Sequence, residues 1–204
     1  MNTLLIATTN TNKTKEIRRI LGNLPLTIKD LTMFPKPHPI VIEDGKTFAE
    51  NALKKAQTYA KHYNMITLAD DSGLEVDALD KQPGIYSARF AGENATDSDL
   101  YKKILKLLKE VPPEKRTARF QCVIAICHPK IWSKTVNGIV EGTITTEPKG
   151  NNGFGYDPIF YYQPLKKTFA ELNLEEKNTI SHRANALRKA LTILKNIFNK
   201  AVTK

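Results

Sequence analysis

The chain has 204 residues, which is enough for one well-buried core but short for two independent domains. Its 41% hydrophobic and 25% charged residues are typical of a globular protein, and no apolar stretch approaches the roughly 20 residues of a membrane-spanning helix. The formal net charge of +10 is compatible with an anionic partner, either a nucleic acid or a phosphorylated small molecule. The basic residues are dispersed and fall mostly on the polar faces of predicted helices, so the charge permits such partners without specifying one.

The lack of a secretory signal at the N-terminus predicts a protein of the cytoplasm. The first residues, Met-Asn-Thr-Leu-Leu-Ile-Ala-Thr, lack the charged region and long apolar core of a secretory signal. Cys122 and Cys127 lie in one apolar run, and their odd spacing places them on opposite faces of a strand. We therefore expect buried thiols, with neither a disulfide between them nor a zinc site.

Strands and helices are interleaved in the order expected of a mixed α/β protein. Apolar runs predict strands over 4–8 and 26–31, one that ends at Ala69, and further strands over 74–79, 119–127, 132–146 and 156–162. Helical apolar spacing predicts helices over 12–21, 47–63, 97–110 and 181–198. No internal repeat or long linker interrupts these elements, and we expect a single domain over 1–204.

Two adjacent aspartates, Asp70 and Asp71, follow an apolar run and precede Ser72-Gly73. Neighbouring carboxylates repel each other and resist burial unless a cation compensates their charge. A metal site and a solvated turn both account for the pattern, because Asp, Ser and Gly are common turn residues. Glu43, which precedes Asp44-Gly45, is either a further metal ligand or an ordinary loop acid.

A strand opens into a helix through the hydroxyl and amide side chains of Thr8 to Asn12, followed by Lys13. Free backbone N–H groups at a helix start, together with a lysine, are suited to binding phosphate. The glycines of a P-loop are missing, and ordinary helix capping would give the same pattern.

Two later segments carry further candidates. A glycine-rich stretch over 150–158 places Phe154 between two glycines and Tyr156 directly after the second, which suits either stacking on a nucleobase or a β-turn with core aromatics. Ser181-His182-Arg183 begins the last predicted helix, where Ser181 is a natural N-cap and the Arg183 guanidinium is able to donate to a carbonyl oxygen.

Six segments, in order along nearly the whole chain, resemble the Ham1-like, or RdgB-type, inosine triphosphate pyrophosphatases. They are Ala7-Thr-Thr-Asn10 with Lys13 and Glu16, Phe48-Ala-Glu-Asn-Ala52, ADDSGLEVDAL over 69–79, PGIYSAR over 83–89, GFGYDP over 153–158, and Ser181-His-Arg183. Any one of them could arise by chance, but the ordered set is specific. The resemblance implies the α/β ITPase-like (Maf/Ham1) fold, in which an elongated mixed β-sheet with flanking helices forms two lobes around a central cleft.

The same resemblance implies hydrolysis of non-canonical purine nucleoside triphosphates (ITP, dITP and XTP) to the monophosphate and pyrophosphate, by a homodimer that uses Mg²⁺. By the family pattern Asp71 is the general base and, with Glu43, a metal ligand, and Asp70 is a further candidate ligand. The substrate-binding residues so implied are Thr8, Thr9, Asn10, Thr11, Asn12, Lys13, Ser72, Phe154, Gly155, Tyr156, Asp157, Lys177, His182 and Arg183.

Within this set, the family pattern assigns the triphosphate to the segment from Thr8 to Lys13. Phe154 would stack on the purine, and Asp157 would accept the ring N–H. The corner formed by His182 and Arg183 would donate to the oxygen at C6, which adenine lacks; a buried hydrogen-bonding site rejects a base without the matching group.

Two other interpretations compete with this one. A pyrophosphatase that acts on other modified or canonical nucleotides would use the same metal chemistry. A basic nucleic-acid-binding module is the third interpretation, and the dispersed charge and the absence of an RRM, KH or helix-turn-helix pattern count against it. We expect no stable nucleic-acid partner and no membrane partner.

Overall fold

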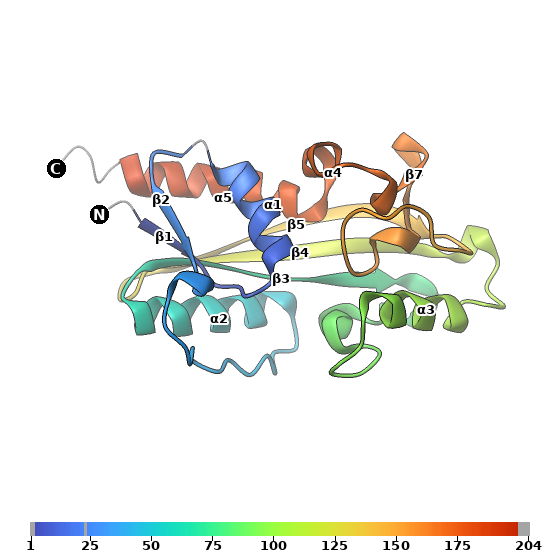
Figure 1. Ribbon diagram of the computed structural model, residues 1–204, viewed down its shortest axis with the longest axis horizontal. Helices are drawn as coiled ribbons and strands as arrows, with labels where there is room; N and C mark the ends of the chain where they lie inside the picture. Colours follow the sequence, from blue (N-terminus) through green and yellow to red (C-terminus); the bar gives the residue numbers. More distant parts are fainter. Residues whose placement is uncertain (1–2, 23, 200–204) are drawn as a thin grey trace. The chain divides into compact units, whose positions relative to one another are not determined.

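A mixed seven-stranded sheet with flanking helices forms the framework of the computed structural model, which describes residues 3–22 and 24–199 (Figure 1). The strand order is β2-β1-β3-β4-β5-β6-β7. The strands are β1 (Thr3–Ile6), β2 (Thr27–Asp30), β3 (Ile66–Val76), β4 (Thr117–Cys127), β5 (Ser133–Ile144), β6 (Phe160–Tyr162) and β7 (Lys167–Thr168). β1 pairs in parallel with β2 and β3, whereas β6 pairs antiparallel with β5 and β7. The predicted mixed α/β architecture is confirmed.

Five α-helices accompany the sheet in the described part of the chain. They are α1 (Thr11–Leu21), α2 (Phe48–Tyr63), α3 (Asp97–Leu107), α4 (Leu174–Ile180) and α5 (His182–Asn199). Of these, α4 was not predicted, and the other four begin within one residue of the predicted positions. None of the helices in the described residues is long and apolar enough to cross a membrane.

The chain divides into two compact units. Among the described residues, unit 1 contains 3–71, 122–138 and 183–199, and unit 2 contains 72–121 and 139–182. The boundary between them falls within β3, β4 and β5, so each of these strands contributes residues to both units. Each unit has a hydrophobic core of its own.

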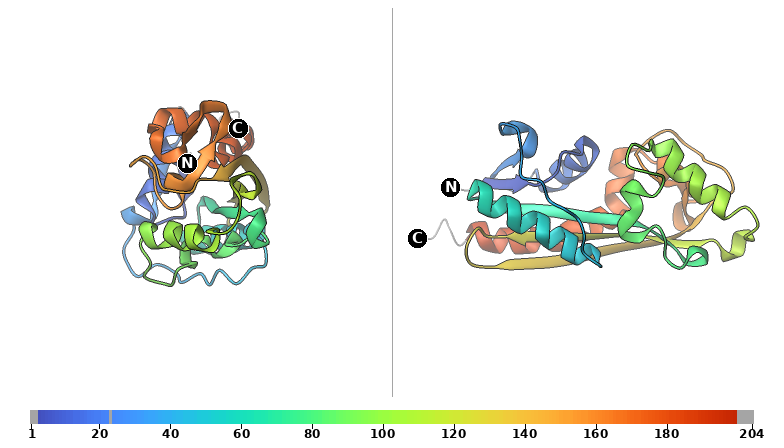
Figure 2. Two further views of the ribbon diagram at one scale, coloured as in Figure 1. Left: turned by 90° about the vertical axis from the view of Figure 1, so that its right-hand side faces the viewer. Right: turned by 90° about the horizontal axis from the view of Figure 1, so that it is seen from below.

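In unit 1, helices cover the sheet on both faces: α1 and α5 lie on one face and α2 lies on the other (Figures 1 and 2). Successive residues of β1, such as Leu4, Leu5 and Ile6, are therefore all buried, as expected for a strand that is covered on both sides. The core under α1 and α5 combines strand residues with helix residues from both, among them Ile17 and Leu187. Both predicted core thiols, Cys122 and Cys127, are free and buried.

Aromatic side chains dominate the core of unit 2. The rings of Phe120 and Phe160 have centroids 4.5 Å apart, and those of Phe160 and Phe169 are 4.9 Å apart in an edge-to-face arrangement. The imidazole of His182 stacks on Phe120 with a centroid distance of 4.7 Å and an interplanar angle of 17°. This stack fixes the last residue of unit 2 against its core.

The predicted break after Ala69 is wrong. β3 runs without interruption from Ile66 to Val76, so the two aspartates lie inside a strand, and the second strand predicted over 74–79 ends early in a 3₁₀ turn, Asp77–Leu79. Local turn preference is overridden here because each carboxylate has its own cationic partner, as described below.

The other departures are smaller. The strand predicted over 156–162 is present only over Phe160–Tyr162, after a 3₁₀ turn at Asp157–Ile159. Ser181 directly precedes α5, as predicted, but it also ends α4 as its C-cap, where its N–H donates to the carbonyl of Lys177.

Candidate active site

The turn between β1 and α1 ends in a capped helix N-terminus. The side chain of Asn10, whose backbone is extended, accepts hydrogen bonds from the backbone N–H groups of Asn12 (3.0 Å) and Lys13 (3.1 Å). The hydroxyl of Thr8 accepts from the N–H of Asn10 at 3.1 Å. The residues from Thr9 to Asn12 are exposed. Capping therefore accounts for the local sequence, and it also presents the open end of the helix, with its partial positive charge, at the surface.

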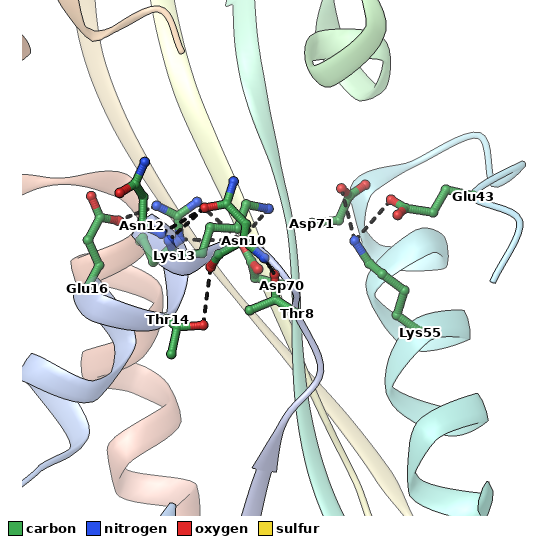
Figure 3. Close-up of polar contacts among 11 residues, drawn as sticks. Thr8, Asn10, Asn12, Lys13, Thr14, Glu16, Glu43, Lys55, Asp70 and Asp71 are labelled. Carbon is green, nitrogen blue, oxygen red and sulfur yellow. Dashed lines mark hydrogen bonds and ion pairs between the residues drawn. The ribbon is translucent and has the colours of Figure 1, made fainter. Parts of the chain in front are cut away.

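A buried network of charges begins at Lys13. Its ammonium lies 3.0 Å from Oδ2 of Asp70, and the same oxygen accepts from Nε (3.3 Å) and Nη2 (3.2 Å) of Arg183. Nη1 of Arg183 pairs with Glu16. Figure 3 shows Lys13, Glu16 and Asp70 on the same side of β3.

This network lies almost entirely out of contact with solvent, since Glu16, Asp70 and Arg183 are 3%, 3% and 1% exposed. Burial by itself would raise the pKa of Asp70, but the charges of Lys13, Arg183 and Lys55 overcome it and hold that pKa far below the usual range. Burial likewise would lower the pKa of Arg183, and its two carboxylate partners raise it instead. Asp70 is therefore ionised at neutral pH, and its carboxylate holds the ammonium of Lys13 in place.

Asp71 belongs to a different cluster, on the opposite face of β3 (Figure 3). The ammonium of Lys55, from α2, lies 3.0 Å from Oε2 of Glu43 and 3.5 Å from Oδ1 of Asp71. Burial and the neighbouring Glu43 raise the pKa of Asp71 above its ordinary value, and Lys55 counteracts them in part. Burial lowers the pKa of Lys55, and Asp71, Asp70 and Glu43 more than reverse that effect. The cluster thus holds two carboxylates beside one cation.

The residues at Asp71 fit a divalent metal ion. Oδ2 of Asp71 is buried and has no hydrogen-bond partner among residues 3–22 and 24–199, and a buried acceptor of this kind calls for a ligand. Glu43 and Asp71 both lie close to the ammonium of Lys55, so the two carboxylates are able to approach the same cation. The described residues contain no group of three or more His, Cys, Asp or Glu arranged to hold a metal. A site with two protein carboxylates suits Mg²⁺, which keeps waters and substrate phosphates in its shell.

Unit 2 contributes an aromatic and charged cluster around the turn that follows Gly153. The ammonium of Lys177 lies 2.5 Å from Oδ2 of Asp157 and 4.7 Å from the centroid of the Phe154 ring. The same oxygen of Asp157 accepts from the N–H of Phe154 at 2.9 Å. Asp157 and Lys177 are only 2% and 3% exposed. The hydroxyl of Tyr156 donates to the carbonyl of Ser87 at 2.8 Å, so the turn is anchored on both sides.

A cavity of about 350 Å³ adjoins this turn within unit 2. Its walls come from the start of α3, including Tyr101, and from the segment 148–155 with Phe154. Cavities of this size accommodate ligands as large as a nucleobase.

Comparison with known proteins shows the family to which the chain belongs. The sequence model of the Ham1 family matches residues 4–193. The chain belongs to the Ham1 family. A dITP/XTP pyrophosphatase of Desulforamulus reducens is 50% identical over 195 residues, 96% of either chain, and one of Geobacter sulfurreducens is 51% identical over 187 residues, 92% of this chain and 94% of that one. The solved structure of a HAM1 protein from Coxiella burnetii superimposes with a TM-score of 0.87 at 41% identity, covering 96% of this chain and all of that one. The predicted family and fold are confirmed.

The site residues predicted from the Ham1 pattern fall into three groups in the structure. On one face of β3, unit 1 brings together the turn from Thr8 to Lys13, Asp70 and Arg183. On the other face it brings together Glu43 and Asp71. Unit 2 holds the remaining predicted residues, which are Ser72, Phe154, Gly155, Tyr156, Asp157, Lys177 and His182.

Three findings go beyond the prediction. Asp70 and Asp71 do not share one site, because neighbouring residues of a strand point to opposite faces. His182 stacks on Phe120 within unit 2, and Arg183 pairs with Glu16 and Asp70 within unit 1. The sequence analysis did not identify Lys55. Its position on the helix that follows Glu43 was visible in the sequence, but this position indicates a role only once α2 is known to face Asp71.

Proposed function

We propose that this chain hydrolyses non-canonical purine nucleoside triphosphates, namely ITP, dITP and XTP, to the monophosphate and pyrophosphate. The observation that carries the proposal is the buried Asp71 carboxylate, which has an unsatisfied oxygen and lies beside Glu43 and Lys55. Membership of the Ham1 family supports it, as do the relatives named dITP/XTP pyrophosphatase at about 50% identity.

In this reaction Asp71 acts as the general base. It accepts a proton from a water molecule as the water oxygen forms a bond to the α-phosphorus and the bond from that phosphorus to the α,β-bridging oxygen breaks, which releases pyrophosphate. Burial raises the pKa of Asp71, which makes it a stronger base than an exposed aspartate, while Lys55 keeps it ionised. Mg²⁺, held by Glu43 and Asp71, would neutralise phosphate charge and act as a Lewis acid.

Lys13 and the start of α1 bind the phosphates. An ammonium group is a compact charge suited to phosphate oxygens, and that of Lys13 is held in place by Asp70 while its side chain keeps 18% of its surface exposed. The backbone N–H groups at the exposed end of α1 add partial positive charge.

The turn from Phe154 to Asp157 binds the base. Phe154 offers a face for stacking, and Lys177 and Phe154 both anchor Asp157, whose carboxylate accepts the N–H of a 6-oxopurine ring. The oxygen at C6 is read by a cationic donor, for which Arg183 is our first candidate. When adenine is bound, the donor for the C6 oxygen and the Asp157 carboxylate lack their hydrogen-bond partners, so adenine is rejected.

Pyrophosphate release from ITP and XTP, each with and without Mg²⁺, tests this function, with ATP, GTP and dTTP as comparison substrates. The proposal expects metal-dependent turnover of ITP and XTP and much slower turnover of the other three. Comparable rates on dTTP or ATP would favour the pyrophosphatase of broader range instead. Steeply salt-dependent binding of DNA or RNA with no turnover would favour the nucleic-acid-binding module. The homodimer, the single domain and the cytoplasmic location remain predictions.

A further inference from the structure

One face of α2 carries a polar side chain at every turn, and all four contact the same segment of chain. The residues are Asn51, Lys55, Tyr59 and Tyr63, which recur at intervals of four and therefore lie in one row along the helix. The segment that they contact, residues 34–47, has no helix or strand of its own and follows α2 in Figures 1 and 2. We call this segment the strap.

The contacts run in antiparallel order along the helix. The hydroxyl of Tyr63 hydrogen-bonds Nδ1 of His38 at 2.9 Å, and that of Tyr59 donates to the carbonyl of Pro39 at 3.1 Å. Lys55 pairs with Glu43 at 3.0 Å, as already described. Oδ1 of Asn51 accepts from the N–H of Gly45 at 2.8 Å. The row thus fastens the strap on both sides of Glu43.

The contact at Gly45 is the tightest of the four. A Cβ at position 45 would lie 2.6 Å from Oδ1 of Asn51 and 2.8 Å from Cβ of Glu50, so the strap backbone is pressed against the helix and only glycine fits. Asn51 itself is fully buried. The hydrogen bond from Gly45 is therefore shielded from water, and water cannot readily replace Asn51 as its acceptor.

The other half of the Asn51 amide is a buried donor, and Asp71 carries a buried acceptor. Nδ2 of Asn51 and Oδ2 of Asp71 are both buried, and neither has a full hydrogen bond within the described ranges 3–22 and 24–199. Asn51 precedes Lys55 by one turn in the same row of α2, and the ammonium of Lys55 lies 3.5 Å from Oδ1 of Asp71, so the two unsatisfied atoms belong to the same buried region. A buried donor and a buried acceptor, each short of a partner, require only a small adjustment to join.

We propose that Asn51 is a positioning residue for the reaction: its oxygen holds the strap at Gly45 and its nitrogen faces Asp71, so that one side chain sets the spacing between Glu43 and Asp71. The proposal rests on the function proposed above for these two carboxylates. Lys55 cannot set that spacing alone, because an ammonium on a flexible four-carbon stem tolerates a range of distances. The planar amide of Asn51 is carried on a short side chain inside a helix, so it restricts the distance to its partners more closely.

Two variants of Asn51 separate its two contacts. Asn51→Ala removes both. Asn51→Asp keeps an acceptor for Gly45 but replaces the donor toward Asp71 with a negative charge. Lys54→Ala is the matched control, because Lys54 is the neighbour of Lys55 on α2 and pairs with the strap at Asp44 (2.6 Å), but both side chains of that pair are well exposed.

The first readout needs neither nucleotide nor activity. Hydrogen exchange should accelerate at least about tenfold over residues 38–47 in Asn51→Ala while β1 and β4 stay protected, and Mn²⁺ affinity measured by electron paramagnetic resonance should fall about 10- to 100-fold, as for other groups that orient metal ligands. Asn51→Asp should keep the exchange protection of the strap. Lys54→Ala should match the wild type in both measurements.

The second readout is kinetic. Both Asn51 variants should lower kcat for ITP by about ten- to 100-fold with a smaller change in KM, since the carboxylates act on the reacting centre. Exchange that accelerates throughout unit 1, or unchanged strap exchange and Mn²⁺ affinity in Asn51→Ala, would overturn the positioning role. If the wild-type chain releases no pyrophosphate from ITP, the proposed function fails, whereas the exchange result still decides whether Asn51 holds the strap.

Discussion

The carboxylates of Asp70 and Asp71 lie on opposite faces of β3, and each is paired with a different lysine, Lys13 for the first and Lys55 for the second. Two like charges next to each other in a buried strand are tolerated because the alternation of the strand separates them and each face supplies its own cation. The two carboxylates also have opposite pKa shifts, since that of Asp70 is lowered and that of Asp71 is raised. Such divergence suits one residue to a fixed structural charge and the other to proton transfer.

Asp70→Asn should destabilise the protein and flatten its acid unfolding profile. The variant leaves Lys13 and Arg183 without their shared buried partner, which costs about 3–5 kcal/mol in comparable cases. The folded-state pKa of Asp70 lies below its ordinary value of 3.8, so its ionisation stabilises the fold above about pH 4 and that stabilisation is lost as the pH falls toward the lowered pKa. Urea unfolding at several pH values between about 3 and 7 measures both effects. Parallel profiles for the variant and the wild type would remove Asp70 from the acid response.

Arg183→Ala tests whether the buried arginine also reads the base. Loss of its pairs with Glu16 and Asp70 should lower the free energy of unfolding by several kcal/mol. The ratio of kcat/KM for ITP to that for ATP does not depend on how much of the enzyme is folded, so it isolates selectivity. A lost charged hydrogen bond of about 1.5–3 kcal/mol should reduce that ratio about ten- to 100-fold. An unchanged ratio would limit Arg183 to holding Asp70 and Lys13.

Gly153→Ala should disrupt the base-binding turn. Gly153 has a φ of +76°, and a Cβ there would lie 2.0 Å from Oδ2 of Asp157, the oxygen that holds both Phe154 and Lys177. We expect kcat/KM for ITP to fall by more than about tenfold. Gly155→Ala is the comparison for stability, because Gly155 has a similar φ of +64° but no atom within 4 Å of the added Cβ, so its free energy of unfolding should fall only by the backbone cost of about 1–2 kcal/mol. An equal loss of stability in the two variants would show that the contact with Asp157 is unimportant.

Elements governed by local chemistry were predictable from the sequence. The apolar stripes of the long helices depend on residues within one or two turns, and the structure confirms the helices predicted from them. The continuation of β3 through Asp70 and Asp71 was not predictable in this way. Asp, Ser and Gly favour a turn locally, and the cations that override this preference come from positions 13, 55 and 183.

The predicted site shows the same division. The family pattern identified the residue types, but it could not separate the face of Asp70 from that of Asp71, because this depends on a strand that appeared to end at Ala69. The contributions of Lys55 and Asn51 were also hidden. Both depend on the strap lying against α2, which is a contact between segments without any shared local signal.

Pyrophosphate release from ITP by a folded Asp71→Asn variant is the most direct test of the proposed chemistry. The amide keeps the shape of the side chain but neither accepts a proton nor neutralises a cation, so the variant should lose at least about 10³-fold in kcat, in line with the loss of a general base that is also a metal ligand. Removing a buried, partly unsatisfied carboxylate should at the same time leave the unfolding midpoint near or above that of the wild type. Folded Asp71→Asn protein that releases pyrophosphate from ITP at close to the wild-type rate would contradict the assignment of Asp71 as the base.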